Sequence, residues 1–165
     1  MGDRCYSVLQ CNNKHIKIFI KLGYSLTSCP SAACNVSSVE MTDEEANYGN
    51  YEELGQLEGK GIPFYGWNGL GSEYSACAFA SDGRNLDFTA CDETGNLTVR
   101  FDKKTFQVNE KDVEECKKYL KVFEQAKFYI DNDLDELAVL GSPVPPKHDK
   151  LVSEYKKRKR NAKIK

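Results

Sequence analysis

Seven cysteines and two histidines are the side chains best suited to nucleophilic or metal chemistry in this chain. A structural zinc site draws four ligands from short-spaced pairs, but the closest cysteines, Cys29 and Cys34, have four residues between them. His15 and His148 lie in no recognisable catalytic context, and no serine lies in a nucleophile elbow. We therefore expect no metal, no cofactor and no assignable catalytic residue; the sequence leaves catalysis open but favours a protein without it.

The odd number of cysteines and the absence of a signal-peptide pattern favour reduced thiols inside a cell. Cys77 and Cys91 fall on neighbouring predicted strands, and sequence alone leaves open whether they pair. No apolar run approaches the ~20 residues that span a bilayer, so no membrane contact is expected. We expect a cytoplasmic protein, or a nuclear one if the cell is eukaryotic.

Residues 62–74 combine aromatic side chains with three glycines, which let a backbone approach a ligand closely. The stretch matches neither a phosphate-binding loop nor a dinucleotide fingerprint. It is interpreted as a loop with two alternatives, an aromatic plug that closes one end of the core or a small-ligand or partner site. The candidate site residues are Tyr65, Trp67, Asn68, Ser72 and Tyr74.

Residues 40–58 carry seven carboxylates and no basic side chain. The stretch is interpreted as an acidic loop, in which Thr42 could cap a short helix. Such a loop is either solvated, or it binds a cation, mimics nucleic-acid phosphate or docks a basic partner, for instance the tail of this chain. The candidate acidic patch consists of Glu40, Asp43, Glu44, Glu45, Glu52 and Glu53.

The formal net charge of −2 conceals a division between the two parts of the chain. Residues 147–165 carry nine basic and two acidic side chains, whereas residues 1–146 carry 14 basic and 23 acidic ones. The sequence thus predicts an α+β body over 1–141, a Pro-rich linker over 142–146 and a basic, helical C-terminal arm over 147–165. The arm residues expected to contact nucleic acid or a partner are Lys150, Lys156, Lys157, Arg158, Lys159, Arg160 and Lys163.

Elements that could position these groups follow from hydrophobic periodicity. Residues 73–81 and 86–91 alternate and flank an Asp-Gly turn, and shorter runs at 97–101 and 105–108 extend this pattern to a three- or four-stranded meander. Asn109 is placed to cap a long helix, whose apolar face contains Val113, Cys116, Leu120 and Phe123.

The N-terminal residues predict a hairpin, with a short strand at 6–10 and a strongly alternating one at 15–22. Together these elements predict an α+β fold, in which an antiparallel sheet packs against one long amphipathic helix.

Three functional hypotheses remain open. The first is a non-enzymatic interaction module whose basic arm contacts nucleic acid or an acidic protein surface. The second is an acidic decoy or inhibitor whose carboxylates occupy a basic protein surface. The third is a small-ligand-binding or catalytic domain centred on residues 62–74. A protein partner or self-association fits the first two hypotheses.

Overall fold

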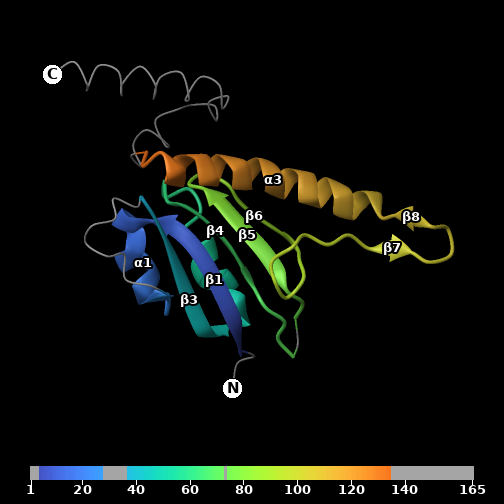
Figure 1. The fold of residues 1–165 in the computed structure, drawn as a ribbon, viewed down its shortest axis with the longest axis horizontal. Helices are drawn as coiled ribbons and strands as arrows, with labels where there is room; N and C mark the ends of the chain where they lie inside the picture. Colours follow the sequence, from blue (N-terminus) through green and yellow to red (C-terminus); the bar gives the residue numbers. More distant parts are fainter. Residues whose placement is uncertain (1–3, 28–36, 73, 135–165) are drawn as a thin grey trace, which may run out of the picture.

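The computed structural model describes residues 4–27, 37–72 and 74–134. One six-stranded antiparallel sheet, in the order β2-β3-β1-β4-β5-β6, packs against the long helix α3 (Glu110–Asp131), which confirms the predicted α+β class (Figure 1). The strands are β1 (Arg4–Asn12), β2 (Ser25–Leu26), β3 (Ser38–Asn47), β4 (Pro63–Asn68), β5 (Cys77–Asp82) and β6 (Leu86–Ala90). Helices α1 (Ile16–Lys21) and α2 (Tyr51–Gly55) are short.

Side chains on the two faces of the sheet form two separate cores, because successive residues of a strand point to opposite sides. On one face, Leu9 and Phe79 pack with Phe19 of α1 and Leu54 of α2. On the other face, the alanines of β5 pack with Tyr119 of α3. Small side chains at these positions let α3 lie close to β5.

Helix α3 begins where the sequence predicts. The Asn109 side chain accepts a hydrogen bond from the Lys111 amide, and Asp112 adds a carboxylate to the first turn. Tyr119, Ala126 and Ile130 of this helix are buried. Leu120, predicted on the same face, is exposed, because a helical step of about 100° from Tyr119 turns it away from the sheet.

The predicted strand at 15–22 is wrong, because this segment is helical. Residues Asn13–His15 form a 3-10 turn that leads into α1, and the Asn12 side chain caps it by accepting from the Lys14 amide. His15 and Phe19, four residues apart, are both buried on one side of the helix. Burial of these two side chains outweighs the strand preference of the alternating isoleucines. The N-terminal hairpin is therefore absent, and β1 pairs with β3 and β4.

The predicted acidic loop is also wrong over its first half. Residues Ser38–Asn47 form β3, because Val39 and Met41 alternate onto the buried face and Ala46 joins them beyond a bulge. A bulge opposite Tyr6 interrupts the pairing of β3 with β1 and leaves Glu44 and Glu45 exposed. No helix is capped by Thr42; the short helix α2 starts nine residues later.

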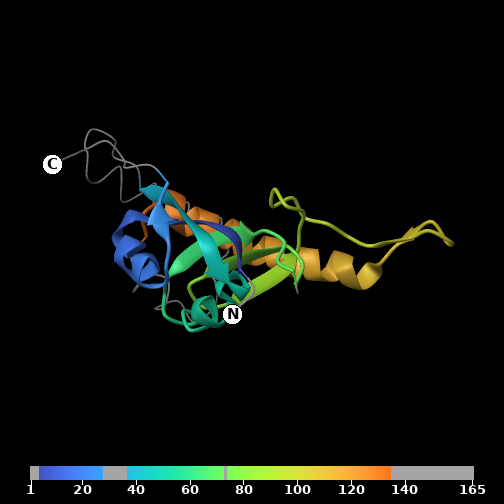
Figure 2. The same cartoon turned by 90° about the horizontal axis from the view of Figure 1, so that it is seen from below.

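The β5–β6 hairpin confirms the first part of the predicted meander. The third and fourth predicted strands do not join the sheet. Instead, β7 (Phe101–Asp102) and β8 (Gln107–Val108) pair only with each other. The start of the predicted third strand makes one isolated bridge, between Leu97 and Cys91. This ribbon stands off the body, beyond the first turns of α3 (Figures 1 and 2).

Several sequence predictions fall outside the described residues. They are the linker at 142–146, the basic arm at 147–165, and the cysteines Cys29 and Cys34. None of the helices in the described ranges is both long and apolar enough to cross a membrane.

Candidate interaction surface

The segment from Thr98 to Val108, called here the β7–β8 hairpin, is the most exposed part of the described chain. All eleven of its residues are exposed. Phe101 pairs with Val108 across the ribbon, and the Phe101 and Phe106 rings meet edge-to-face with centroids 6.0 Å apart. One side of the ribbon is therefore apolar. The large apolar side chains that the hairpin exposes are Val99, Phe101, Phe106 and Val108.

An ion pair fixes the base of the hairpin to α3. The backbone N–H and the Nε of Arg100 donate to Oδ2 of Asp112 at 2.8 and 2.9 Å, and Nη2 donates to Oδ1 at 2.6 Å. A backbone bond from Asn109 to the Arg100 carbonyl closes the ribbon at 2.9 Å. A bidentate pair combines charge with fixed geometry, so the hairpin has a defined root although its strands are short.

The loop of the hairpin forces Phe106 into the left-handed region of backbone space. Asp102 accepts hydrogen bonds from the amides of Lys104 and Thr105, and its carbonyl accepts from the Phe106 amide. Phe106 then has a φ of 57°, where Gly or Asn is the usual residue. Its side chain is 77% exposed. A bulky ring at this position costs backbone strain and gains little burial, so folding alone does not explain it.

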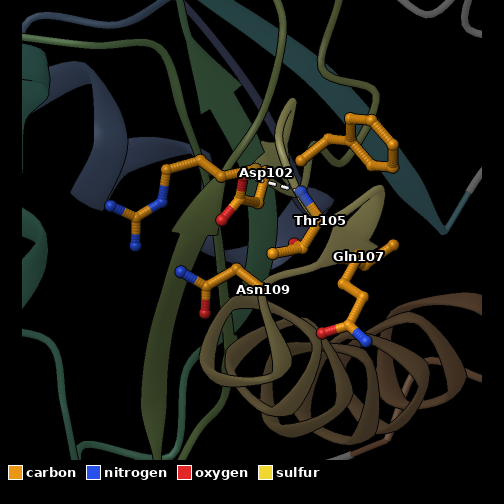
Figure 3. A pocket seen from close by; sticks show the side chains of 7 residues that line it. Asp102, Thr105, Gln107 and Asn109 are labelled. Atoms are coloured by element: carbon orange, nitrogen blue, oxygen red, sulfur yellow. Dashed lines mark hydrogen bonds between the residues drawn. The ribbon is translucent and has the colours of Figure 1, made fainter.

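A pocket of about 310 Å³ borders the hairpin, and its lining includes Phe101 and Val108 as well as polar side chains. Figure 3 shows Asp102, Thr105, Gln107 and Asn109 around it, with the hydrogen bond between Asp102 and Thr105 drawn. The only carboxylate among the lining residues, Asp102, already accepts the loop amides, and these bonds lower its pKa. The lining residues include no histidine, cysteine or lysine, so they form neither a nucleophile–base pair nor a metal site.

We predict that protonating Asp112 frees the root of the hairpin. Hydrogen bonds from Arg100 lower the pKa of Asp112 to about 2, against roughly 3.9 for an unfolded aspartate. The stabilisation is therefore complete above pH ~4 and is lost as the pH falls towards 2. The NMR signal of the Arg100 Nε–H should shift as the pH falls from about 4 to 2. In the Asp112→Asn variant this shift should be absent. Glu114→Gln, which breaks a surface pair with Lys117 on the same helix, is the control and should leave the titration unchanged.

Replacing Phe106 with asparagine is predicted to leave the fold intact. Asparagine tolerates a positive φ, so relief of strain should offset the loss of an exposed aromatic pair. The free energy of unfolding, from denaturant titration at low protein concentration, should change by less than about 1 kcal/mol. Phe106→Ala removes the ring but keeps most of the backbone strain. Comparison of the two variants therefore separates the loss of the aromatic pair from the relief of strain. A loss well above this value in both variants would mean that the ring supports the fold.

The structure separates the predicted ligand-site residues of 62–74 instead of gathering them in one loop. Residues Pro63–Asn68 of this stretch form strand β4, so Tyr65 and Trp67 face α3 while Asn68 faces the opposite core. Tyr65 packs on Phe123 with ring centroids 4.9 Å apart. The loop interpretation is therefore wrong, because β1 and β5 flank β4 on both sides.

Asn68 and Tyr74 lie near α2, on the other side of the sheet from Trp67. Buried Asn68 accepts a hydrogen bond from the Tyr51 hydroxyl at 3.1 Å, and burial raises the pKa of Tyr51. The Tyr74 ring lies 6.3 Å from that of Tyr51, and Ser72 is exposed in the loop after β4. These residues form no common site with Trp67, which instead contacts Tyr6 and the turn at Gly95.

The predicted acidic residues are distributed over two elements. Asp43, Glu44 and Glu45 line a concavity of about 400 Å³ beside β2, and Glu45 pairs with Arg4. Glu40 lies further along β3, and Glu52 and Glu53 occupy the first turn of α2, where carboxylates favour the helix dipole. The structure thus brings three of the six predicted carboxylates together at one edge of the sheet.

Cysteine and metal chemistry find little support within the described ranges. The five described cysteines, Cys77 and Cys91 among them, are free thiols, and burial raises the pKa of Cys91 to about 12. A thiol with a raised pKa is a poor nucleophile near neutral pH. Over the same residues, no three His, Cys, Asp or Glu side chains are grouped to hold a metal ion.

The apolar residues of the hairpin were missed as candidate site residues, because alternation alone assigns Val99 and Phe101 to a core strand. One signal could have indicated exposure. The turn Asp102-Lys103-Lys104-Thr105 is short and polar, and a Phe follows it where a loop of this kind favours Gly or Asn.

Comparisons with protein families, with curated proteins and with solved structures gave no match for this chain.

Proposed function

We propose that this protein is an interaction module that docks on a protein partner through the apolar side of the β7–β8 hairpin. The observation that carries the proposal is Phe106, which exposes 77% of its surface at a strained backbone position. Strain that the fold does not require is a reason to look for function at that residue. Contact with a partner would bury the ring and supply the missing stabilisation.

The chemistry of the hairpin fits a protein surface. Aromatic and aliphatic side chains are typical of the buried centre of an interface, whereas charged ones surround it. Here Phe101 lies in β7, Phe106 ends the loop and packs on the Phe101 ring, and Lys103 and Lys104 lie at the tip. The ribbon has only two strands, so each also offers an outer edge to a partner strand.

Site-specific photo-crosslinking in the producing cells tests this proposal. A photoreactive phenylalanine analogue at position 106 should give discrete crosslinked species that a second substitution, Phe101→Ser, abolishes. The control places the same analogue at Lys60, an exposed residue in the turn after α2. Equal, diffuse labelling from both positions, or none from position 106, would rule the hairpin out as a docking element.

A second candidate function is binding of nucleic acid by the arm at 147–165. The charge division of the sequence favours it, because the arm carries a formal charge of +7 and the rest of the chain −9. The arm has Lys and Arg but no set of side chains suited to contact base edges. It would therefore bind phosphates without selecting a nucleotide sequence.

A titration with duplex DNA and single-stranded RNA at two salt concentrations tests this second function. The full chain should bind weakly and lose affinity steeply with salt. A chain with glutamine at positions 156–160 should bind less tightly, with a log–log salt slope lower by up to about 4. Equal binding by the two chains, or none by either, would contradict the role of the arm.

A further inference from the structure

A second surface that none of the described elements covers lies on the sheet itself, on the face that α3 covers only in part. Helix α3 packs mainly on β4, β5 and β6. On the same face of β1 and β3, Val8 pairs with Thr42 and Gln10 pairs with Glu40. These residues, together with Tyr6, are called here the open half-face. Tyr6 is 43% exposed, Glu40 is exposed and the other three are partly exposed.

The open half-face and the hairpin are complementary in chemistry. Tyr6 and Val8 form an apolar centre beside Trp67, whose ring centroid lies 5.9 Å from that of Tyr6. Carboxylates flank this centre, since Glu40 lies on the neighbouring strand β3, opposite Gln10, and the bulge places Glu44 beside Tyr6. The hairpin offers an apolar centre with Lys103 and Lys104 at its tip. Opposite charges around matching apolar centres favour docking of one on the other.

One molecule does not bring these two surfaces together. In both views the hairpin extends beyond the N-terminal end of α3, away from β1 and β3 (Figures 1 and 2). The Arg100–Asp112 pair holds its root in that direction. A second copy of the chain has no such restriction.

We infer that two copies of this chain exchange their hairpins, each docking the apolar side of its hairpin on the open half-face of the other. This inference rests on the proposed function and names the partner. The arrangement is a two-fold dimer with two identical contacts, because each copy supplies one hairpin and one acceptor face. In each contact Phe101 and Phe106 lie against Tyr6 and Val8, and the lysines at the tip lie near Glu40.

Molar mass by light scattering, from about 1 μM to about 0.5 mM of full chain, tests the inference. The wild-type mass should rise from one copy to two. Phe101→Ser with Phe106→Asn, and separately Tyr6→Ser, should raise the dissociation constant at least about tenfold. Ile20→Ser and Tyr48→Ser are matched controls, because both residues are similarly exposed and lie outside the two surfaces; they should dimerise like wild type.

Mixing the two kinds of variant distinguishes hairpin exchange from other dimers. A chain without a functional hairpin and a chain without a functional half-face can still form one of the two contacts, so the mixture should associate more than either alone. Hairpins that pair with each other would give no such recovery. Glu40→Lys, which leaves buried residues untouched, should weaken the dimer, and Lys103→Glu with Lys104→Glu in the same chain should restore it.

A wild-type chain that stays monomeric at about 0.5 mM, or a Tyr6→Ser chain that folds and dimerises normally, would overturn the inference. The crosslinking experiment at position 106 tests the proposed function separately. Crosslinks that contain only peptides of this chain support both the docking function and the hairpin exchange, whereas crosslinks to a different protein support docking and contradict the exchange. The absence of crosslinks contradicts both.

Discussion

Replacing Gly66 with alanine is expected to destabilise the protein by at least about 3 kcal/mol. Gly66 lies in β4 between β1 and β5, paired with Leu9 on one side and Phe79 on the other. A Cβ at this position would overlap the Val8 carbonyl oxygen and come within 2.9 Å of the Leu9 Cα and of the Phe79 ring. Backbone atoms cannot yield as a flexible side chain does, so the strands would have to separate.

Denaturant titration of Gly66→Ala checks this expectation, with Gly55→Ala as the control. Gly55 is the last residue of α2, and a Cβ there would meet no atom within 4 Å. The control should gain about 0.5–1 kcal/mol, because alanine loses less backbone entropy on folding into a helix. A Gly66→Ala protein within about 1 kcal/mol of wild type would show that β1 and β4 do not pack as described.

Truncating Phe79 to alanine is expected to cost about 3–5 kcal/mol. Phe79 is fully buried at the centre of β5, packs against Phe64 and belongs to the core that α1 and α2 close. Removal of its ring loses burial and leaves a cavity that the surrounding strands cannot fill. The size of the destabilisation depends on where the ring lies, because removal of the same atoms from the exposed Phe106 should change the free energy of unfolding little.

The comparison of Phe79→Ala with Phe106→Ala is best made at about 1 μM. Self-association at higher concentration would add stability that depends on the hairpin and confuse the two effects. The midpoint of unfolding should fall steeply for Phe79→Ala and stay near wild type for Phe106→Ala. Similar losses in both variants would mean that the hairpin is part of the core and is no docking element.

The sequence predicts best the elements whose signals are local. Asn109 and the acidic residues after it mark the start of α3, and the Asp-Gly turn at 82–83 marks the β5–β6 hairpin. In both, the capping or turn chemistry lies within a few residues of the element that it ends. The α+β class follows from these two elements together.

The incorrect predictions concern segments whose structure depends on distant residues. The isoleucines of 16–20 alternate as in a strand, but burial of His15 and Phe19 against the sheet makes the segment helical. The strand β3 was not predicted because its sequence is rich in carboxylates and only its three apolar side chains, Val39, Met41 and Ala46, are buried in the core. The glycines of 62–71 suggest a loop, although Gly66 is needed for the close approach of two strands.

The candidate surface was the least predictable feature, because alternation reports which side chains share a face and says nothing about what covers it. Val99 and Phe101 satisfy the pattern of a core strand, and only the structure shows that both are exposed and that Phe101 pairs within the hairpin instead of in the sheet. The backbone of Phe106 is likewise set by loop closure at Asp102, which composition does not reveal. The basic arm lies outside the described residues, so its role stays a prediction.

Hydroxyl-radical footprinting of the unmodified chain is the most direct test of the central claim that the hairpin docks on a protein. The oxidation rate of Phe106 would be measured in the producing cells and in dilute purified protein, with Tyr48 as an internal reference of known exposure. Docking predicts that the ratio of Phe106 to Tyr48 oxidation falls severalfold in cells. An unchanged ratio would mean that the hairpin remains exposed in the cell and would contradict the proposed function.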